Sequence, residues 1–324
     1  METVSIAHCF NNNYCKMAAA TIASEIRHFS ESFHYDIYIV HNDITEENQY
    51  LLGRLNTRSN VSLKFVAFDP EAMAGRGLYN RGHFSKDMYA RLYLHRVLPG
   101  LERVVYTDTD FVVSGDLAQV FNAPLGKYPI GIVVRDRGQA KIEMLKHHDY
   151  VKETEFGKYA NLYEYLTGYL KFTEEDCDTY FSSCLIVFNL KAAGKILDEG
   201  MPALMGNKYL FPDQDILNIL FKNNKFVLER RFNTMPWEVL DYVREHGKLP
   251  DVIHFAGPVK PNRTIGSMGD IEYWRYVSGT DFYYQALEAF IDNKLAALRS
   301  EIEGLARKKK KRSKKRGKSP KKKK

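Results

Sequence analysis

The amino-acid sequence predicts an α/β fold. Short apolar runs rich in β-branched and aromatic residues alternate with longer stretches of helix-compatible apolar spacing, which is the pattern of strands connected through helices. The chain has 324 residues, 44% of them hydrophobic and 27% charged, so it can bury the core of one large domain or two moderate ones. This composition excludes a chain that is disordered throughout.

Residues 1–190 are predicted to form successive strand-helix units. The expected strands are Val4–Phe10, Tyr35–Val40, Val61–Phe68, Arg103–Thr107, Ile130–Val134 and Ser183–Leu190. The expected helices are Lys16–Phe29, Thr45–Thr57 and Ser85–Leu98, the last with Ser85 as N-cap and Pro99-Gly100 as its stop. The segment Arg135–Tyr180 is rich in Tyr, Glu and Lys without a clean period, and it is predicted to be a helical insertion over one end of the sheet.

The C-terminal part of the chain predicts a long helix followed by a disordered tail. Apolar residues recur at steps of three and four after Asp281, which indicates an amphipathic helix; they are Tyr283, Leu287, Phe290, Ile291, Leu298, Ile302 and Leu305. Residues 307–324 hold 14 Lys or Arg, no acid and no apolar side chain to bury. Like-charge repulsion, with Gly317 and Pro320, predicts disorder there.

Charge and cysteine content narrow the function classes. The net charge is +7, but residues 1–306 carry only 33 basic residues against 40 acidic ones. A folded domain that reads nucleic acid would spread Lys and Arg over its surface, so no specific nucleic-acid binding is expected. Cys9, Cys15, Cys177 and Cys184 show no Cys-x-x-Cys spacing and are expected to be reduced and buried. With no apolar run of about 18 residues and no secretory leader, a cytoplasmic location is expected.

The most informative stretch is Arg103 to Val113, in which Asp108-Thr109-Asp110 follows an apolar strand. Side chains alternate along a strand, so Asp108 and Asp110 should project to the same side. Paired carboxylates at the carboxyl end of a strand can bind a divalent cation, and substrate phosphates commonly complete the coordination shell of that cation. A solvated turn with two acids is the plainer alternative. The pairs Asp176/Asp178 and Asp213/Asp215 share the spacing but lack the preceding buried strand.

Two further elements could complete such a site. In the run from Val252 to Pro261, His254 could ligate a metal, Gly257 would let the backbone approach a phosphate, and Lys260 could place a charge on it. The alternative is that His254 is a satisfied core residue. In the run from Phe211 to Asn218, an acid-amide-acid cluster opens an apolar helix, and its alternative role is capping by Asp213.

Together these blocks resemble family 8 glycosyltransferases. Four blocks occur in the order found in that family: Asp108-Thr109-Asp110, Tyr180 to Leu190, Asp213 to Asn218, and His254 to Pro261. The resemblance covers residues 1–265 and is strongest to bacterial lipopolysaccharide galactosyl- and glucosyltransferases. It implies a GT-A, Rossmann-like catalytic domain at 1–270. The apolar spacing and the charge of the remaining residues add a helical segment at 271–306 and a disordered polybasic tail at 307–324.

The resemblance also implies site residues. Asp108, Asp110 and His254 would ligate Mn²⁺, with Mg²⁺ as an alternative, and Gly257 and Lys260 would hold the phosphates. Further donor contacts would come from Arg91, Thr109, Asp136, Ser182 and, beside the uracil, Ala7, Asn13 and Tyr14. Asp213, Gln214 and Lys260 would be catalytic. The chain departs from the family at His8-Cys9-Phe10, where an acid is common, and at Ser182-Ser183-Cys184, where Asn-Ala-Gly is common.

The implied activity is retaining, metal-dependent transfer of galactose or glucose from a UDP-sugar to a glycan or glycolipid, with lipopolysaccharide or another cell-surface glycan as the expected acceptor. Gln214 is a poor nucleophile, which favours same-face attack by the acceptor hydroxyl, and Asp213 is the reserve nucleophile. The basic tail is expected to hold the enzyme on the inner face of the membrane through anionic lipids. The alternatives are a protein- or self-glucosylating transferase in the manner of glycogenin, and a nucleic-acid-binding protein working through its tail. A sugar nucleotidyltransferase would need a Gly-rich phosphate loop, which Phe10 to Tyr14 lacks.

Overall fold

The computed structural model describes residues 1–74, 78–79, 86–257, 260–261 and 265–316. Within these residues, seven strands form one sheet in the order β3-β2-β1-β4-β7-β6-β8, and β5 pairs with β9 in a second, two-stranded sheet. The strands are β1 (Thr3–Cys9), β2 (His34–His41), β3 (Val61–Ala67), β4 (Arg103–Thr107), β5 (Phe111–Val113), β6 (Ile130–Val133), β7 (Leu185–Asn189), β8 (Phe226–Leu228) and β9 (Val252–His254).

The connecting segments are mostly helical, which confirms the α/β class. The helices are α1 (Cys15–His28), α2 (Glu46–Gly53), α3 (Pro70–Ala74), α4 (Leu94–Val97), α5 (Ala118–Phe121), α6 (Gly138–His147), α7 (Leu162–Gly168), α8 (Glu174–Asp178), α9 (Leu190–Leu204), α10 (Pro212–Leu220), α11 (Val239–His246), α12 (Met268–Val277) and α13 (Tyr283–Arg316). Short 3₁₀ segments are η1 (Asn12–Tyr14), η2 (Lys86–Tyr93), η3 (Tyr150–Glu153), η4 (Arg230–Phe232) and η5 (Pro236–Glu238).

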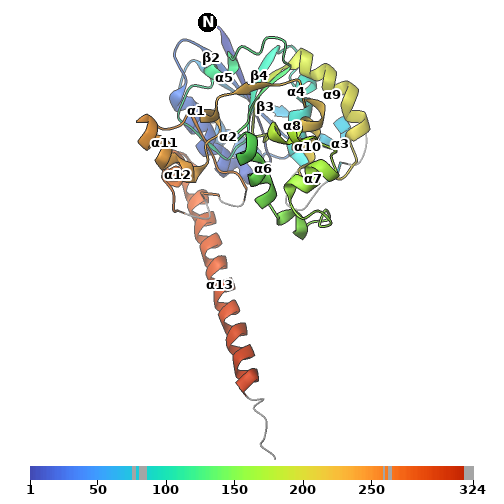
Figure 1. Cartoon of the computed structure of the whole chain (residues 1–324). Helices are drawn as coiled ribbons and strands as arrows, with labels where there is room; N and C mark the ends of the chain where they lie inside the picture. The colour runs from blue at the N-terminus through green and yellow to red at the C-terminus, as the bar shows by residue number, and fades with distance from the viewer. Residues whose placement is uncertain (75–77, 80–85, 258–259, 262–264, 317–324) are drawn as a thin grey trace, which may run out of the picture.

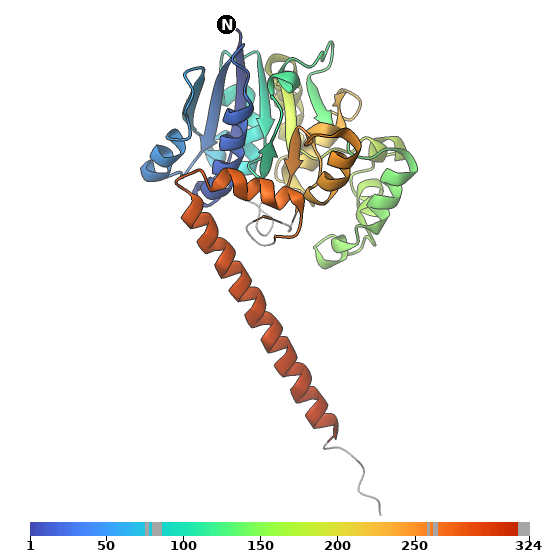
Figure 2. The same ribbon diagram turned by 90° about the vertical axis from the view of Figure 1, so that its left-hand side faces the viewer.

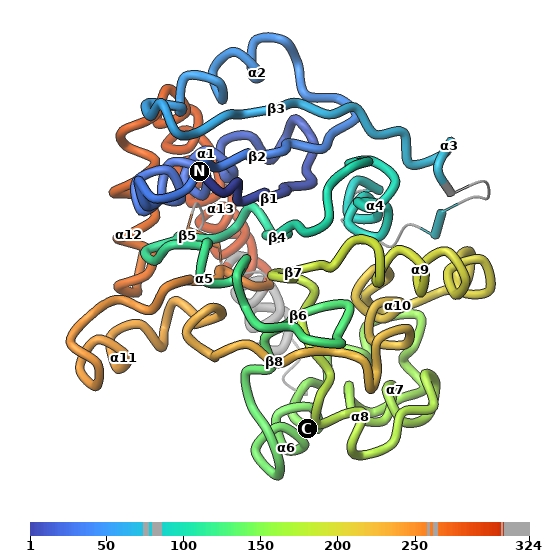
Figure 3. Tube along the Cα trace, turned by 90° about the horizontal axis from the view of Figure 1, so that it is seen from above, coloured from blue at the N-terminus to red at the C-terminus, as the bar shows by residue number. Residues whose placement is uncertain are grey.

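The large sheet lies between two helical layers. Seen from above in Figure 3, α1, α5 and α12 lie on one side of the strands, and α4, α9 and α10 lie on the other. Strands β1, β2, β3 and β4 run parallel, whereas β7 is antiparallel to β4 and β6. The carboxyl ends of β1 and β4 therefore meet at the same edge, where ligands bind in open α/β sheets.

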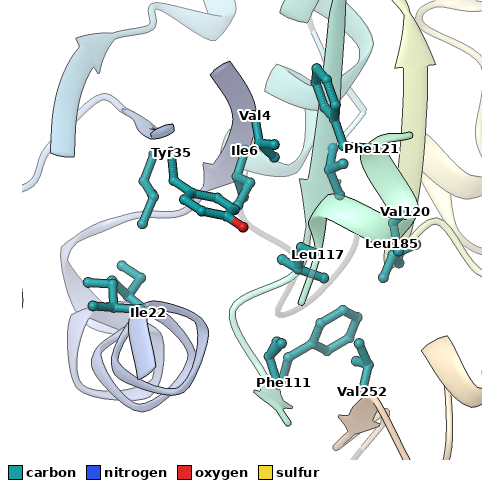
Figure 4. Packing of buried hydrophobic residues seen from close by; sticks show 14 of the residues in the cluster. Val4, Ile6, Ile22, Tyr35, Phe111, Leu117, Val120, Phe121, Leu185 and Val252 are labelled. Carbon is teal, nitrogen blue, oxygen red and sulfur yellow. The ribbon is translucent and has the colours of Figure 1, made fainter. Parts of the chain in front are cut away.

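The core beneath α1 shows why the first strands and helix were predictable. Val4 and Ile6 of β1, two residues apart, belong to the same buried apolar cluster as Ile22 of α1 (Figure 4), as expected when alternate strand residues face one layer. The Tyr35 ring stacks on Phe29 with centroids 3.8 Å apart. Its hydroxyl donates to the Asp116 carboxylate at 2.8 Å, so the polar end of this buried side chain is satisfied.

One predicted helix differs in the structure. The segment expected to form a helix over Ser85–Leu98 is the 3₁₀ segment η2 followed by the short helix α4, and Ser85 lies outside the described residues. Every residue from Asp87 to Tyr93 is buried. Contacts on all sides of this segment therefore decide its backbone, and they override its apolar spacing.

The predicted helical insertion is confirmed as a separate lobe. Helices α6, α7 and α8 lie together beside the β6–β8 edge of the sheet (Figure 3). Their apolar side chains form a cluster of their own, which includes Leu145, Phe156, Tyr165 and Leu166. The insertion thus has its own small core.

Helix α13 projects away from the rest of the protein (Figures 1 and 2). It continues to Arg316, past the boundary at residue 306 where the sequence predicted a disordered tail. Lys and Arg favour the helix intrinsically, so a helix started earlier can propagate into the basic run; residues 317–324 lie outside the described residues. No helix in the described part of the chain is long and apolar enough to cross a membrane.

Candidate active site

The Asp108-Thr109-Asp110 segment links β4 to β5, and helix α1 fixes its backbone. The hydroxyl of Thr21 lies 2.8 Å from the Thr109 carbonyl oxygen and accepts the Phe111 N–H at 3.2 Å. The Asp108 N–H donates to the Cys184 carbonyl at 2.7 Å. Thr109 is buried, and ligand atoms of Asp108 and Asp110 lie within 4.8 Å of each other. Neither aspartate lies in a strand, so the link between β4 and β5 brings the carboxylates together, and not the strand alternation from which their proximity was predicted.

Strand β9 brings His254 to these carboxylates. In the antiparallel β5–β9 pair, Phe111 is the partner of His254, and the Phe255 N–H donates to the Asp110 carbonyl at 2.9 Å. One ligand atom each from Asp108, Asp110 and His254 lie within 4.8 Å of one another.

The His254 imidazole is held in the form that can ligate a metal. Burial lowers the pKa of His254 to about 4, so the ring is neutral. Its Nδ1 lies 2.9 Å from the Asn233 Oδ1, which accepts a hydrogen bond and thereby fixes the proton on Nδ1. The lone pair of Nε2 then faces Asp110 Oδ1 at 3.7 Å. His254 is therefore more than a satisfied core residue.

The carboxylate oxygens also fit a divalent cation. Asp110 Oδ1 is buried and has no hydrogen-bond partner among the described residues, whereas Oδ2 pairs with the Lys260 ammonium. Burial alone would raise the pKa of Asp110, but Lys260 and His254 outweigh it and lower that pKa. Burial raises the pKa of Asp108 to about 6. Two carboxylates and one neutral imidazole are a donor set suited to Mg²⁺ or Mn²⁺.

Arg91 of η2 connects this cluster to the start of α10. Its guanidinium lies 3.0 Å from Asp108 Oδ1 and 3.0 Å from Asp213 Oδ2, and it stacks over the Tyr106 ring at 4.4 Å. It also donates to the Ser183 hydroxyl at 2.8 Å. Arg91 thus fixes two carboxylates at a site where burial would otherwise disfavour their charges.

The acid-amide-acid cluster has a role other than capping. Helix α10 begins at Pro212 after the N-cap Phe211, and no side chain caps it. Asp213 instead accepts the Ser183 hydroxyl at 2.9 Å. Gln214 donates from Nε2 to the Tyr180 hydroxyl at 2.7 Å and accepts the Ser183 N–H at 3.3 Å.

Asp215, the third member of this cluster, is a buried acceptor. It receives the hydroxyl of Tyr180 at 2.6 Å and that of Tyr165 at 2.8 Å. Burial raises its pKa to about 6. The Asp176 pair is also structural, because Asp176 closes a capping box with Thr173 at the start of α8.

The remaining predicted residues lie around this centre. Ala7 of β1 pairs with Tyr106 of β4, just before Asp108. Asn13 and Tyr14 lie in η1 with exposed side chains, and Asp136 follows β6, 3.8 Å from the Arg230 guanidinium.

Two more predicted residues lie in loops. Ser182 lies in the loop before β7. Gly257 has φ +71°, a left-handed conformation that favours glycine, and residues 258–259 beside it lie outside the described residues.

His8 and the cysteines are turned into the core. His8 has no exposed surface; its Nε2 lies 3.0 Å from Glu25 Oε2 and its Nδ1 lies 3.0 Å from the Thr107 hydroxyl. It therefore occupies the α1 side of β1, away from Asp108. The four cysteines are buried and unpaired, as the sequence predicted.

Sequence reasoning missed Asn233 as the group that orients His254 and Ser183 as the link between Arg91 and Asp213. Ser183 lies in the block from Tyr180 to Leu190, which the resemblance marked only by its position among the family's blocks. Nothing in the sequence around Asn233 marks it as a partner of His254, because the two residues meet only through the fold.

Known proteins resemble this chain over most of its length. The family profile described as "Glycosyl transferase family 8" matches residues 5–266. The lipopolysaccharide 1,2-glucosyltransferase of Escherichia coli (strain K12) is 25% identical over 300 residues, which cover 85% of this chain and 77% of that protein. Glycosyltransferase GlyF of Streptococcus pneumoniae serotype 4 (strain ATCC BAA-334 / TIGR4) is 27% identical over 276 residues, covering 83% of this chain and 60% of that protein.

Solved structures share the fold. The bifunctional glycosyltransferase WbbM aligns with a TM-score of 0.71 and 27% identity, covering 89% of this chain and 52% of the WbbM chain. The galactosyltransferase LgtC, solved with donor and acceptor sugar analogs, aligns with a TM-score of 0.63 and 22% identity, covering 86% of this chain and 96% of LgtC. These neighbours confirm the GT-A fold that the sequence predicted. Since the family profile spans most of the chain, this protein belongs to glycosyl transferase family 8.

Proposed function

We propose that this glycosyltransferase moves galactose or glucose from a UDP-sugar to a glycan or glycolipid acceptor, with retention at the anomeric carbon and with Mn²⁺ or Mg²⁺ as cofactor. The observation that carries the proposal is the cluster of Asp108, Asp110 and His254. In it a neutral imidazole faces a buried carboxylate oxygen that has no hydrogen-bond partner in the part of the chain that the structure describes. The names of the lipopolysaccharide glucosyltransferase and of the galactosyltransferase LgtC support a hexose donor and a lipopolysaccharide-type acceptor.

The chain's own residues prepare the departure of the nucleotide. When bound, a divalent cation would offset the negative charge that grows on the diphosphate as the sugar leaves. Lys260 already stands beside Asp110, so its ammonium is positioned to meet the same charge. The Arg91 guanidinium lies 3.0 Å from Asp108 Oδ1 and would help to hold that carboxylate in place.

Retention is best explained by attack on the same face of the sugar. A double displacement needs a free carboxylate near the anomeric carbon. Asp213 is a weak candidate because Oδ2 already binds Arg91 and the Ser183 hydroxyl. Gln214 is an amide held between Tyr180 and Ser183, suited to positioning a sugar and unsuited to bonding with it. The acceptor hydroxyl would therefore attack directly and pass its proton to the departing phosphate oxygen.

Calorimetry of UDP binding tests the metal site. We expect the full chain to bind UDP in the presence of Mn²⁺ and to lose this binding with a chelator or in Asp110→Asn. The matched control is Asp178→Asn, which removes a charge from the Asp176/Asp178 pair on α8 and should leave UDP binding normal. Equal UDP uptake with and without the ion would overturn the proposal. In a separate assay, slow hydrolysis of UDP-glucose or of UDP-galactose by the wild type would show which of the two is the donor.

We also propose that residues 307–324 hold the enzyme on the anionic cytoplasmic face of a membrane. The region carries 14 basic residues, and each Lys or Arg near such a surface contributes about 1 kcal/mol. Truncation after Leu305 should release the protein from vesicles containing phosphatidylglycerol and leave transfer to soluble acceptors unchanged. Undiminished vesicle binding by the truncated chain would refute the role of the tail.

A further inference from the structure

Helix α13 exposes a stripe of apolar side chains where it leaves the body of the protein. At its base Ala286 is buried and the Phe290 ring meets the Trp274 ring at 5.6 Å. Beyond this contact the helix runs free of the other elements in two perpendicular views (Figures 1 and 2). The stripe is 46–65% exposed and consists of Ile291, Leu295, Leu298, Ile302 and Leu305.

The spacing of the stripe is that of a coiled-coil seam. Its members follow one another at alternating steps of four and three residues, a mean period of 3.5. In heptad terms Leu295 and Ile302 take the a positions, and Ile291, Leu298 and Leu305 take the d positions. A single helix with such a seam in water gains little from its own hydrogen bonds, so burial against another helix is what stabilises it.

We propose that the stripe binds the stripe of a second copy of this chain in an antiparallel coiled coil. In the register that pairs a with d positions, Leu295 faces Leu298 of the second copy and Ile291 faces Ile302 of the second copy. Leu305 then lies beyond these paired layers, opposite Glu288 of the second copy. A two-fold axis perpendicular to the helices relates the copies, so every contact occurs twice.

The charges beside the stripe select the antiparallel orientation. In that register Lys294 lies beside Glu301 of the second copy, and Asp292 lies beside Arg299 of the second copy. All four flanking pairs are then of opposite sign. In a parallel pair, Lys294 would lie beside Arg299 of the second copy, which puts like charges together on both sides.

The same charges argue against a lipid surface as the occupant of the stripe. Residues 283–306 carry four acidic and two basic side chains, whereas helices that lie on anionic leaflets carry Lys and Arg on their polar face. The basic residues begin at Arg307, beyond the stripe. The helix therefore separates two tasks, with pairing by the stripe and lipid contact by the tail.

Mass measurement on the full chain tests the pairing. Light scattering after size exclusion should give twice the chain mass of 37.5 kDa for the wild type and the single mass for Leu298→Glu. Ala297→Glu adds the same charge at an exposed residue outside the stripe and should stay dimeric. The rate of donor hydrolysis should be the same in all three proteins. The test of pairing is therefore independent of the test of the proposed activity. A monomeric wild type would overturn the proposal, as would equal dimer content in the two variants.

A charge reversal tests the orientation. Lys294→Glu faces Glu301 of the second copy in the antiparallel pair, so the dissociation constant should rise roughly fivefold to tenfold, and Glu301→Lys added to it should restore the affinity. In a parallel pair the same Lys294→Glu change would meet Arg299 and tighten the dimer. A tighter dimer would overturn the antiparallel arrangement. If the wild type and Leu298→Glu are both monomeric and Leu298→Glu alone loses vesicle binding, the stripe binds lipid and the pairing proposal is overturned.

Discussion

Asn233 is the residue whose removal most directly tests how the metal site is oriented. It is 1% exposed, and its Oδ1 accepts the Nδ1 proton of His254 at 2.9 Å. In Asn233→Ala, that proton has no acceptor in a buried place, which costs about 1–3 kcal/mol. The ring can relieve this cost by moving its proton to Nε2, where Asp110 Oδ1 lies 3.7 Å away. The atom that should ligate the metal would then carry a proton.

We expect Asn233→Ala to weaken Mn²⁺ binding about 10- to 100-fold, which is the usual effect of removing a hydrogen-bond partner from a ligating histidine. Titration of free Mn²⁺ by electron paramagnetic resonance, in the presence of UDP, measures it. Asn233→Asp keeps the acceptor oxygen and should restore most of the affinity. The control is Asn218→Ala, equally buried and bonded to the Phe181 backbone, which should lower thermal stability without changing Mn²⁺ affinity. Mn²⁺ affinity within twofold of wild type in Asn233→Ala would refute this account of His254.

Two further predictions concern pH and the phosphate loop. Burial raises the pKa of Asp108 to about 6, while His254 stays neutral down to about pH 4. Protons should therefore compete with Mn²⁺ at Asp108, and the Mn²⁺ affinity should fall as the pH drops below about 6. An unchanged Mn²⁺ affinity from about pH 7 to pH 5 would contradict this. Gly257→Ala forces a Cβ onto a left-handed backbone with φ +71°, at a cost of about 1–2 kcal/mol in urea unfolding, and should also weaken UDP binding. Gly206→Ala, with φ +86°, should lose similar stability but bind UDP normally.

The strands and first helices could be predicted because their own residues carry the signal. In β1 and β4 successive apolar residues face the two helical layers in turn. The bounds of β4 in the structure, Arg103–Thr107, are those that were predicted. Strand β8 was missed because Phe226–Leu228 is three residues long and offers no period to detect. Helix η2 was predicted as α-helical because its apolar spacing says nothing of the buried contacts that shape its backbone.

The sequence could predict which chemical groups each segment of the site supplies, but not the distances between groups on different segments. The sequence predicted that Asp108 and Asp110 lie together, but it gave strand alternation as the reason, whereas in the structure both residues lie in the link between β4 and β5. The distance from Asp110 to His254 depends on the β5–β9 pair, which joins residues far apart in the chain. Arg91 is similar: the family resemblance marked it, but its bonds to Asp108 and Asp213 follow from the packing of η2 against α10.

His8 shows why a departure from the family pattern needs the structure to interpret it. Strand alternation places Ala7 on the side of Tyr106, where Asp108 follows, and His8 on the side of α1. A polar residue on the α1 side must find buried partners, and Glu25 and the Thr107 hydroxyl are those partners. A nucleotide base bound on the Asp108 side would meet Ala7 and not His8. If the proposed UDP site is correct, base contacts are expected from residues after the strand, such as Asn13 and Tyr14 in the exposed segment η1.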